Sequence, residues 1–445
     1  MTRRVPPPLP RRLLMLAAPA LLGGCETLNN LLGERKVRLP GERRSVLQAE
    51  APLAADAEEA GRVALPAPGP VAEWPMAGGT PSHSPGHIAV SEALSVAWRS
   101  SVGSGSAYRQ RIVTGPVIAN GTIFTVDAWG VVSAHALADG RQRWRTDTTP
   151  EDESAVPLGG GAAFADGTLF VATAAAEVMA LDPTNGSIRW RERLPSAARG
   201  APTVAGGRIF VPTIENQLAA HSVEDGKRIW MHSAAPLVTI PLGLPAPAVE
   251  GDAVVAGFGS GELLALRAND GRVLWAESLG GTGRMSLADI VGITGLPVIA
   301  GGRVIALGQA NIAIAVDLRS GRRLWERPFG GGAGPAVAGD WAFAVTDAGE
   351  ALAIGREDGR ISWVTELDPA PPTGRRGDPA RFGRPMVAGG RVLVPSTRGE
   401  VLQLDPTSGQ IVGRIPVRSP LSLPMASAEG YVVALADDGT LIALR

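Results

Sequence analysis

Two histidines have the spacing that most directly points to chemistry in this sequence. His83 and His87 are four residues apart, and on a helix this spacing would place both imidazoles on one face, where they could bind a metal ion. Pro85 and Gly86 lie between them, however, and this pair favours a loop. We therefore expect no metal site at this position.

Glycine clusters at residues 159–161, 280–283 and 330–332 are the next candidates, because glycine-rich loops can bind phosphate. None of them continues as Gly-Lys-Ser or Gly-Lys-Thr into a helix, so we interpret them as loops between structural repeats. The sequence also has no nucleophile elbow and no His-Glu-x-x-His motif. Arg109 and Arg111 could bind an anion, and an interpretation as solvated surface is equally open.

The single cysteine, Cys25, follows a segment with the features of a secretion signal. Residues 1–24 carry Arg3, Arg4, Arg11 and Arg12 ahead of an apolar stretch that is too short to span a membrane. The sequence Leu22-Gly23-Gly24-Cys25 resembles the bacterial lipobox, whose cysteine is acylated and becomes the mature N-terminus. A lone cysteine is otherwise a small buried hydrophobe, but this position favours lipidation. We predict a lipid-anchored, exported protein.

Composition divides the rest of the chain and limits its partners. Residues 25–73 are rich in alanine, proline and charged residues, which predicts a flexible tether after the lipidated N-terminus. Residues 74–445 carry the repeat described below and are expected to form one domain. The chain has 42 Lys and Arg against 43 Asp and Glu, so it lacks the basic excess that nucleic-acid binding requires.

Tryptophan recurs at regular intervals and is the strongest signal in the sequence. Six of the seven tryptophans in this series follow a glycine by four residues, and the pattern A-x-D-x-x-x-G-x-x-x-W occurs in full at Ala180–Trp190 and Ala315–Trp325. Glycine suits a tight turn between two strands, and tryptophan offers a large face to a neighbouring sheet. The series consists of Trp98, Trp144, Trp190, Trp230, Trp275, Trp325 and Trp363.

Each tryptophan hairpin follows two further predicted strands, which gives eight units of four strands and an all-β, eight-bladed β-propeller. The last unit is one strand short, and Leu94–Trp98 can supply that strand, so an N-terminal strand closes the ring. A parallel β-solenoid is the alternative, but its repeats are usually shorter. Gly413 replaces the tryptophan of the seventh unit, and we expect that blade to pack less tightly on its neighbour.

The repeat resembles the tryptophan-docking motif of the quinoprotein (PQQ-like) propeller superfamily over residues 94–445. That superfamily contains both PQQ-dependent dehydrogenases and non-enzymatic lipoproteins, so the fold does not decide the function. Its enzymes carry an adjacent cysteine pair, a calcium site and often a haem-binding Cys-x-x-Cys-His. The only cysteine here is Cys25, so the resemblance implies no cofactor, no metal and no enzyme activity.

Three features resemble the BamB family of α-proteobacterial type, the lipoproteins of the outer-membrane β-barrel assembly machinery. They are the lipobox, residues Leu39–Leu47 in the tether, and Trp74–Gly79 before the propeller. Members of that family bind a periplasmic domain of the central barrel-assembly protein through two loops on one face. The matching stretches here are residues 237–247 and 280–297, with Leu242 where the family has arginine, and with Gly292 and Thr294 at acidic positions.

The resemblance therefore implies a periplasmic scaffold that binds the central assembly protein, aids barrel insertion and also contacts unfolded outer-membrane proteins. Glu26, rather than aspartate, follows Cys25, which indicates sorting to the outer membrane. A PQQ-dependent oxidoreductase or a sugar-binding propeller is the alternative. The expected contact residues are Leu242, Gly243, Leu244, Arg284, Asp289 and Ile290.

Overall fold

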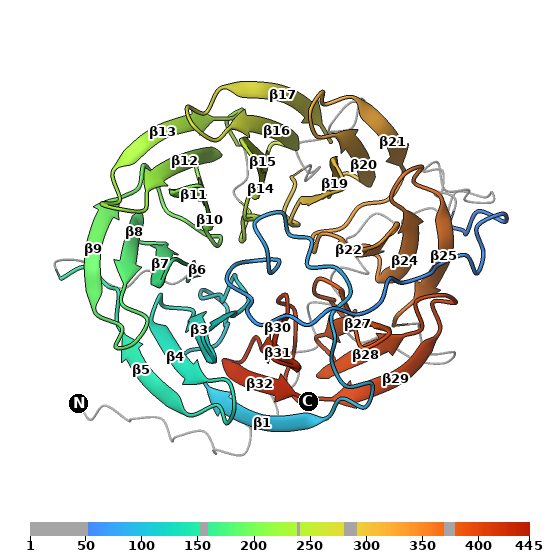
Figure 1. Cartoon of the computed structure of the whole chain (residues 1–445), viewed down its shortest axis with the longest axis horizontal. Helices are drawn as coiled ribbons and strands as arrows, with labels where there is room; N and C mark the ends of the chain where they lie inside the picture. Colours follow the sequence, from blue (N-terminus) through green and yellow to red (C-terminus); the bar gives the residue numbers. More distant parts are fainter. Residues whose placement is uncertain (1–51, 152–158, 238–240, 280–291, 369–378) are drawn as a thin grey trace, which may run out of the picture. The chain divides into compact units, whose positions relative to one another are not determined.

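The computed structural model describes residues 52–151, 159–237, 241–279, 292–368 and 379–445. Contacts divide the chain into two units, Met1–Pro52 and Leu53–Arg445, and the second unit contains all of the strands. The described residues form 32 strands in eight four-stranded antiparallel sheets, which are arranged as the blades of a ring (Figure 1). They include no helix that is long and apolar enough to cross a membrane.

The first four blades follow the chain in order, each from the inner strand to the outer strand. Blade 1 consists of β2 (Val117–Ala119), β3 (Thr122–Val126), β4 (Val132–Ala136) and β5 (Gln142–Thr146). Blade 2 consists of β6 (Gly160–Ala165), β7 (Thr168–Thr173), β8 (Glu177–Leu181) and β9 (Ile188–Arg193). Blade 3 consists of β10 (Thr203–Ala205), β11 (Arg208–Thr213), β12 (Gln217–Ser222) and β13 (Arg228–Ser233). Blade 4 consists of β14 (Ala248–Glu250), β15 (Ala253–Gly257), β16 (Glu262–Arg267) and β17 (Val273–Ser278).

The other four blades complete the ring. Blade 5 consists of β18 (Val298–Ala300), β19 (Arg303–Gly308), β20 (Ile312–Asp317) and β21 (Arg323–Arg327). Blade 6 consists of β22 (Ala336–Ala338), β23 (Trp341–Val345), β24 (Glu350–Gly355) and β25 (Ile361–Glu366). Blade 7 consists of β26 (Met386–Ala388), β27 (Arg391–Ser396), β28 (Glu400–Leu404) and β29 (Ile411–Pro416). Blade 8 consists of β30 (Ala426–Ala428), β31 (Tyr431–Leu435), β32 (Thr440–Leu444) and β1 (Val96–Ser101).

The ring closes through an N-terminal strand, as the sequence predicts. β1 is the outer strand of blade 8 and pairs antiparallel with β32, from Val96 opposite Leu444 to Ser101 opposite Thr440. This pairing covers the edge that β32 would otherwise expose. The all-β, eight-bladed propeller with tryptophan-docking repeats is therefore confirmed.

Each tryptophan of the series links its blade to the next one. Trp144 lies opposite the small Ala134 in its own sheet, and its Nε1 donates to the carbonyl of Pro183 in blade 2 at 2.8 Å. A Cβ atom on Gly186 would lie 2.4 Å from the Trp144 ring, and the φ of Gly186 is +74°. Because both the close approach and the left-handed backbone exclude a side chain, this turn needs glycine.

Blade 7 departs from this pattern in two positions at once. Gly413 stands where the tryptophan is expected, and the facing residue is the larger Gln403 instead of alanine. No turn joins β32 to β1, so blade 8 has no glycine turn on which a tryptophan could dock. Ile415 and Val417 share one buried cluster with residues of blade 8, so other apolar side chains fill this junction.

Residues 53–68, which the sequence analysis assigned to the tether, pack against blades 6 and 7 in this structure. The Asp56 amide donates to the carbonyl of Ile361 at 2.8 Å, and the Ser362 hydroxyl donates to the carbonyl of Glu59 at 2.7 Å. Val63 is buried in a cluster with Trp363. Apolar and hydrogen-bonding residues of this stretch therefore have partners in the blades. The packed part of the chain begins before residue 73, where the sequence places the end of the tether.

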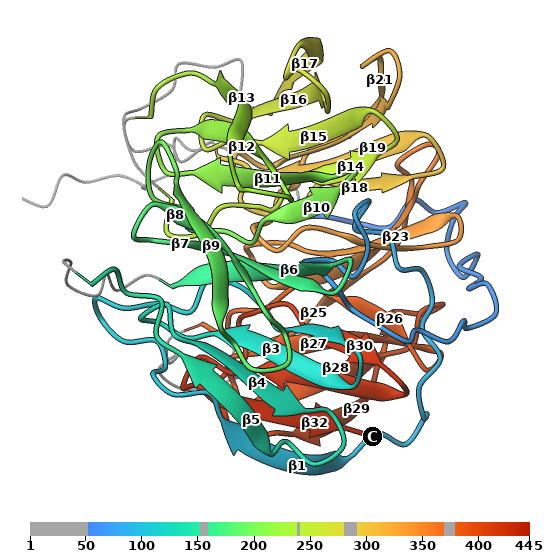
Figure 2. The ribbon, with the colours of Figure 1, turned by 60° about the vertical axis from the view of Figure 1, so that its left-hand side comes forward.

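Residues 69–89, called the strap here, cross one end of the ring axis (Figures 1 and 2). The strap turns within residues 76–83 and makes backbone hydrogen bonds to the inner strands or inner turns of six blades. In blade 1, the Trp74 amide donates to the carbonyl of Ile118 at 2.7 Å, and the Ile118 amide donates back at 2.8 Å. The other bonds are Phe164 N to Pro75 O (2.6 Å), Val249 N to Pro81 O (2.7 Å), Ile299 N to Ser82 O (2.9 Å), Ile88 N to Val387 O (2.9 Å) and Glu429 N to Val71 O (2.8 Å).

Candidate functional site

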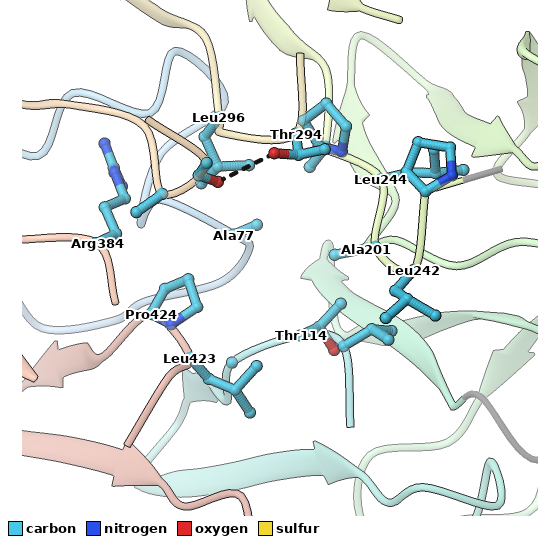
Figure 3. Close-up of a pocket in the computed structure, with 18 of the residues that line it drawn as sticks. Ala77, Thr114, Ala201, Leu242, Leu244, Thr294, Leu296, Arg384, Leu423 and Pro424 are labelled. Carbon is cyan, nitrogen blue, oxygen red and sulfur yellow. Dashed lines mark hydrogen bonds between the residues drawn. The ribbon is translucent and has the colours of Figure 1, made fainter. Parts of the chain in front are cut away.

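An axial cavity of about 1120 Å³ occupies the centre of the ring. Its floor is formed by the strap residues Trp74, Ala77 and Gly78, and its walls are the connections that lead into the inner strands of several blades. Figure 3 shows Ala77 near the middle of the labelled side chains, with Leu242 and Leu423 on the surrounding walls. Most lining residues are glycine, alanine, proline, leucine or valine, so the cavity is mainly apolar.

The rim of this cavity includes the first loop that the sequence analysis selected for partner binding. Leu242, Gly243 and Leu244 all line the cavity mouth. The Leu242 side chain is 57% exposed, whereas Leu244 is half-buried and its amide donates to the carbonyl of Arg199 at 3.0 Å. The loop therefore presents an exposed leucine from an anchored backbone. Exposed apolar residues of this kind are common contact residues at protein interfaces.

A buried amide, Asn216, fixes the start of this rim loop. Its Nδ2 donates to the carbonyl of Ala235 at 2.6 Å and to the Ser260 hydroxyl at 3.0 Å, and its Oδ1 accepts from the Gly259 amide at 2.9 Å. Glu262 accepts from the Ala235 amide at 2.8 Å. No sequence motif marks Asn216. The available signal is an asparagine in a short turn, because asparagine adopts positive φ more readily than most residues. The φ of Asn216 is +60°, and its side chain is directed at the loop.

Residues 280–291 of the second predicted loop and the lipidation site lie outside the described residues. Arg284, Asp289 and Ile290 fall within residues 280–291, and Cys25 falls within residues 1–51. Both described ends of the second loop are held: the Leu279 amide donates to the carbonyl of Gly261 at 2.8 Å, and the Gln309 amide donates to the carbonyl of Gly292 at 3.0 Å. The second loop thus connects blade 4 to blade 5, and the first loop is the preceding connection between blades in the chain.

The two spaced histidines serve the strap and do not face each other. His83 Nδ1 lies 2.7 Å from the carbonyl of Pro297, and burial, with a smaller contribution from the Arg384 charge, lowers the pKa of His83 from 6.5 to about 3. His87 Nδ1 lies 2.7 Å from the carbonyl of Pro66, and its Nε2 accepts from the Gly390 amide at 3.0 Å. Among the described residues, no group of three or more His, Cys, Asp or Glu side chains could hold a metal ion.

Arg384 is a buried cation whose hydrogen-bond partners are backbone carbonyls. Its Nε and Nη2 donate to the carbonyl of Pro335 at 3.0 and 2.8 Å, and Nη2 also donates to the carbonyl of His83 at 2.8 Å. Burial lowers the pKa of Arg384 to about 10, so the side chain stays charged at neutral pH. No sequence motif marks this residue, which ties the strap to the wall of the cavity.

The cavity does not fit the quinone that the superfamily's enzymes use. PQQ carries three carboxylates and needs several cations or free donors, but Arg384 already donates to carbonyls. The Thr114 hydroxyl donates to the carbonyl of Gly160 at 2.9 Å, and the Thr294 hydroxyl donates to the carbonyl of Gly332 at 3.5 Å. Among the described lining residues there is also no Asp or Glu to hold a calcium ion.

Solved structures of similar fold include both kinds of protein that share this repeat. BamB from Moraxella catarrhalis matches with a TM-score of 0.65 and 19% identity, covering 78% of this chain and 99% of that one. A europium-containing methanol dehydrogenase matches with a TM-score of 0.66 and 14% identity, covering 82% of this chain and 89% of the enzyme. At these identities the structures show the fold and do not separate a scaffold from an enzyme.

Sequence comparison identifies the family of the chain. Two of the similar proteins are named outer membrane protein assembly factor BamB. The one from Vibrio cholerae is 37% identical over 253 residues, which cover 56% of this chain and 64% of that protein. The one from Shewanella oneidensis is 27% identical over 335 residues, which cover 73% of this chain and 82% of that protein. The relative from Alkalilimnicola ehrlichii is 28% identical over 212 residues, which span 47% of this chain and only 53% of that protein. The family model described as outer membrane protein assembly factor BamB matches residues 128–365 and 371–445, more than half of the chain. The chain therefore belongs to the BamB family of outer membrane protein assembly factors.

Proposed function

We propose that this protein is a non-enzymatic scaffold lipoprotein, which binds the periplasmic domain of the central barrel-assembly protein and thereby aids insertion of barrels into the outer membrane. The observation that carries the proposal is the exposed Leu242 on the anchored rim loop, at the position where the family resemblance places a partner contact. A binding function needs such a surface and no catalytic group.

The shape of the rim loop supports a direct protein contact. An exposed leucine on a loop held by buried hydrogen bonds can be desolvated by a partner without a large loss of chain entropy. Leu242 replaces the arginine of the family pattern, so the contact at this position is apolar instead of charged. Arg284 and Asp289, on the loop that follows in chain order, are proposed to supply the polar part of the same interface, and Ile290 is proposed to add an apolar contact.

The proposal includes an anchor at the N-terminus. Acylation of Cys25 would attach the protein to the periplasmic face of the outer membrane, and residues 25–52 would form the tether that remains before the packed residues begin. Acyl chains contribute about 0.8 kcal/mol for each buried CH₂ group, so several chains make a stable anchor.

Copurification after crosslinking tests the proposed contact. The full-length lipidated protein is expected to recover the central barrel-assembly protein, and Leu242→Asp is expected to reduce the recovery by about tenfold or more, because it places a charge in an apolar contact. Val412→Asp is the matched control, since Val412 is also an exposed apolar residue, 52% exposed, but lies on the outer strand of blade 7. Equal recovery with both variants would contradict the proposed surface.

The alternative of a PQQ-dependent oxidoreductase or a sugar-binding propeller gains no support from the cavity. Its described lining is mainly apolar, and its threonine hydroxyls and buried arginine are already hydrogen-bonded to carbonyls. Both ligands would need several free polar groups.

A further inference from the structure

The outer strand of blade 6 is covered by residues 53–63 of the same chain. The Asp56 amide donates to the carbonyl of Ile361 at 2.8 Å, and the Ile361 amide donates back to the Asp56 carboxylate at 2.7 Å. Arg327 of blade 5 pairs with the same carboxylate at 2.8 Å. Ile361 and Ser362, the first two residues of β25, are both buried. An outer strand of this propeller can therefore hold a segment that brings a carboxylate to the start of the strand.

The segment over blade 6 combines charged and apolar contacts. Arg360, directly before β25, pairs with the carboxylates of Glu58 and Glu59 at 3.4 and 3.3 Å. Val63 is buried in a cluster with Trp363. The occupant of this outer strand thus carries carboxylates beside apolar side chains.

The outer strand of blade 4 has the same register as that of blade 6. In β17 and in β25, a bulge falls directly before the tryptophan, so the preceding residue is skipped in the pairing with the neighbouring strand. The residues therefore correspond in pairs: Arg272 with Arg360, Val273 with Ile361, and Leu274 with Ser362.

The residues of blade 4 are exposed where those of blade 6 are buried. Val273 and Leu274 are 40% and 48% exposed, and Ile229 and Met231 on β13, the preceding outer strand of the ring (Figure 1), are exposed as well. These four, called the outer wall here, are most of the exposed large apolar side chains among the described residues. Apolar side chains gathered on a surface in this way mark interaction sites.

The charge beside the outer wall is also without a partner. Arg272 is exposed and forms no ion pair with a carboxylate of the described residues, because the nearby Asp270 pairs with Arg267. Its counterpart Arg360 pairs with two carboxylates. β13 continues into the rim loop that presents Leu242, so the outer wall adjoins the proposed partner contact.

We propose that the outer wall extends the interface with the barrel-assembly protein and binds a segment of it in which a carboxylate lies beside apolar side chains. The carboxylate pairs with Arg272 and accepts from the Val273 amide, as Asp56 accepts from Ile361, and an apolar neighbour covers Leu274. The inference rests on the proposed function, because that function supplies the partner.

The first test removes the apolar contact. Leu274→Asp is compared with Val412→Asp in the full-length protein, because Val412 is exposed and precedes Gly413 at the same bulge of blade 7. The probe is the isolated periplasmic domain of the barrel-assembly protein. We expect Leu274→Asp to weaken its binding by about tenfold or more and Val412→Asp by less than about twofold. Equal affinities of the two variants would overturn the inference.

The second test reverses the charge. Arg272→Glu is compared with Arg322→Glu, because Arg322 is an exposed arginine three residues before the tryptophan of blade 5, as Arg272 is in blade 4. Both changes alter the net charge equally. Only Arg272→Glu is expected to weaken binding of the domain, by about fivefold or more, with a smaller effect at high salt because salt screens the ion pair. Equal weakening by both variants would mean that net charge alone acts, which contradicts a specific pair.

The outcomes separate the outer wall from the rim contact. Binding that is weakened by Leu242→Asp but not by Leu274→Asp overturns the inference and leaves the scaffold proposal in place. No binding of the domain by the unaltered protein contradicts the scaffold proposal and the inference with it. Self-association that Leu274→Asp abolishes, with unchanged binding of the domain, would assign the outer wall to a second copy of the chain and also overturn the inference.

Discussion

At the scale of single residues, the propeller depends on a steric match between a tryptophan and the glycine turn of the next blade. Trp144 and Gly186 illustrate it: the indole donates a hydrogen bond across the blade interface, and the glycine leaves no Cβ to prevent the approach. This match could be predicted from the sequence because the pattern repeats at fixed spacing. The partner carbonyl of Pro183 could not be predicted, since it depends on the turn geometry.

Substitution of Gly186 separates this docking effect from backbone strain. Gly186→Ala places a Cβ 2.4 Å from the Trp144 ring, whereas Gly207→Ala introduces the same strain at the same φ of +74° but meets no atom within 4 Å. We expect Gly186→Ala to lower the free energy of unfolding by about 1–3 kcal/mol more than Gly207→Ala does. Urea unfolding of both variants measures the difference, and equal losses would refute the steric account.

His83 predicts a dependence of stability on pH. Its pKa falls to about 3 in the folded protein, so protonation favours the unfolded chain, in which the pKa is about 6.5. The stabilisation is complete above pH 6.5 and is lost as the pH falls toward 3; at pH 5 about 2 kcal/mol is lost through this residue. Asparagine tolerates the positive φ of His83, which is +60°, and does not titrate.

We therefore expect the free energy of unfolding of His83→Asn to change less between pH 7 and pH 5 than that of the unaltered protein, by about 2 kcal/mol. Urea unfolding at the two pH values measures this change. The other histidines of the chain are present in both proteins and cancel in the comparison. An identical pH dependence would show that His83 is not held neutral by burial.

At the scale of elements, the strands were easier to predict than the segments that line the site. The four-strand units follow from apolar runs and glycine turns, but the strap has no such periodicity. Its hydrogen bonds join positions far apart in the sequence, such as Trp74 with Ile118 and Ile299 with Ser82. Residues 53–68 looked like a tether for the same reason, because their composition is that of a loop and their partners lie in blades 6 and 7.

The rim loop offers a prediction at this scale. Asn216→Gly keeps the positive φ of residue 216 but removes the amide that holds Ala235 and Gly259, so the loop that presents Leu242 should lose order. We expect roughly a two- to tenfold weaker association with the barrel-assembly protein, from the cost of ordering the loop on binding. Asn120→Gly, at an exposed turn with a φ of +50°, is the control for the backbone effect.

Binding of each purified variant to the isolated periplasmic domain of the barrel-assembly protein measures this effect. An Asn216→Gly affinity no different from that of Asn120→Gly would mean that the rim loop does not need its buried amide.

At the scale of the whole propeller, the ring has two unlike ends. The strap closes one end of the axial cavity, and the rim loop that presents Leu242 lies at the cavity mouth, so the proposed binding surface and the strap line different parts of the cavity. The sequence predicted the ring, its closure and the placement of Leu242 in a loop. It did not predict the cavity, because the cavity is lined by connections into the inner strands that are distant from one another in the chain.

The anchor gives a prediction for the full-length protein. Residues Leu53–Arg445 form a unit with its own contacts, so Cys25→Ala is expected to leave the propeller folded while it moves the protein from the membrane fraction to the soluble fraction. Fractionation of cells, with circular dichroism of the purified variant, tests both parts. Retention of the variant in the membrane would argue against lipidation as the anchor.

Site-specific photocrosslinking in cells tests the central claim most directly, which is that the rim of the propeller binds the barrel-assembly protein. A photoreactive residue at position 242 is expected to crosslink to that protein, whereas the same residue at position 412, on the exposed outer strand of blade 7, is not. Crosslinks of equal yield at both positions, or a crosslink at position 412 alone, would contradict the account.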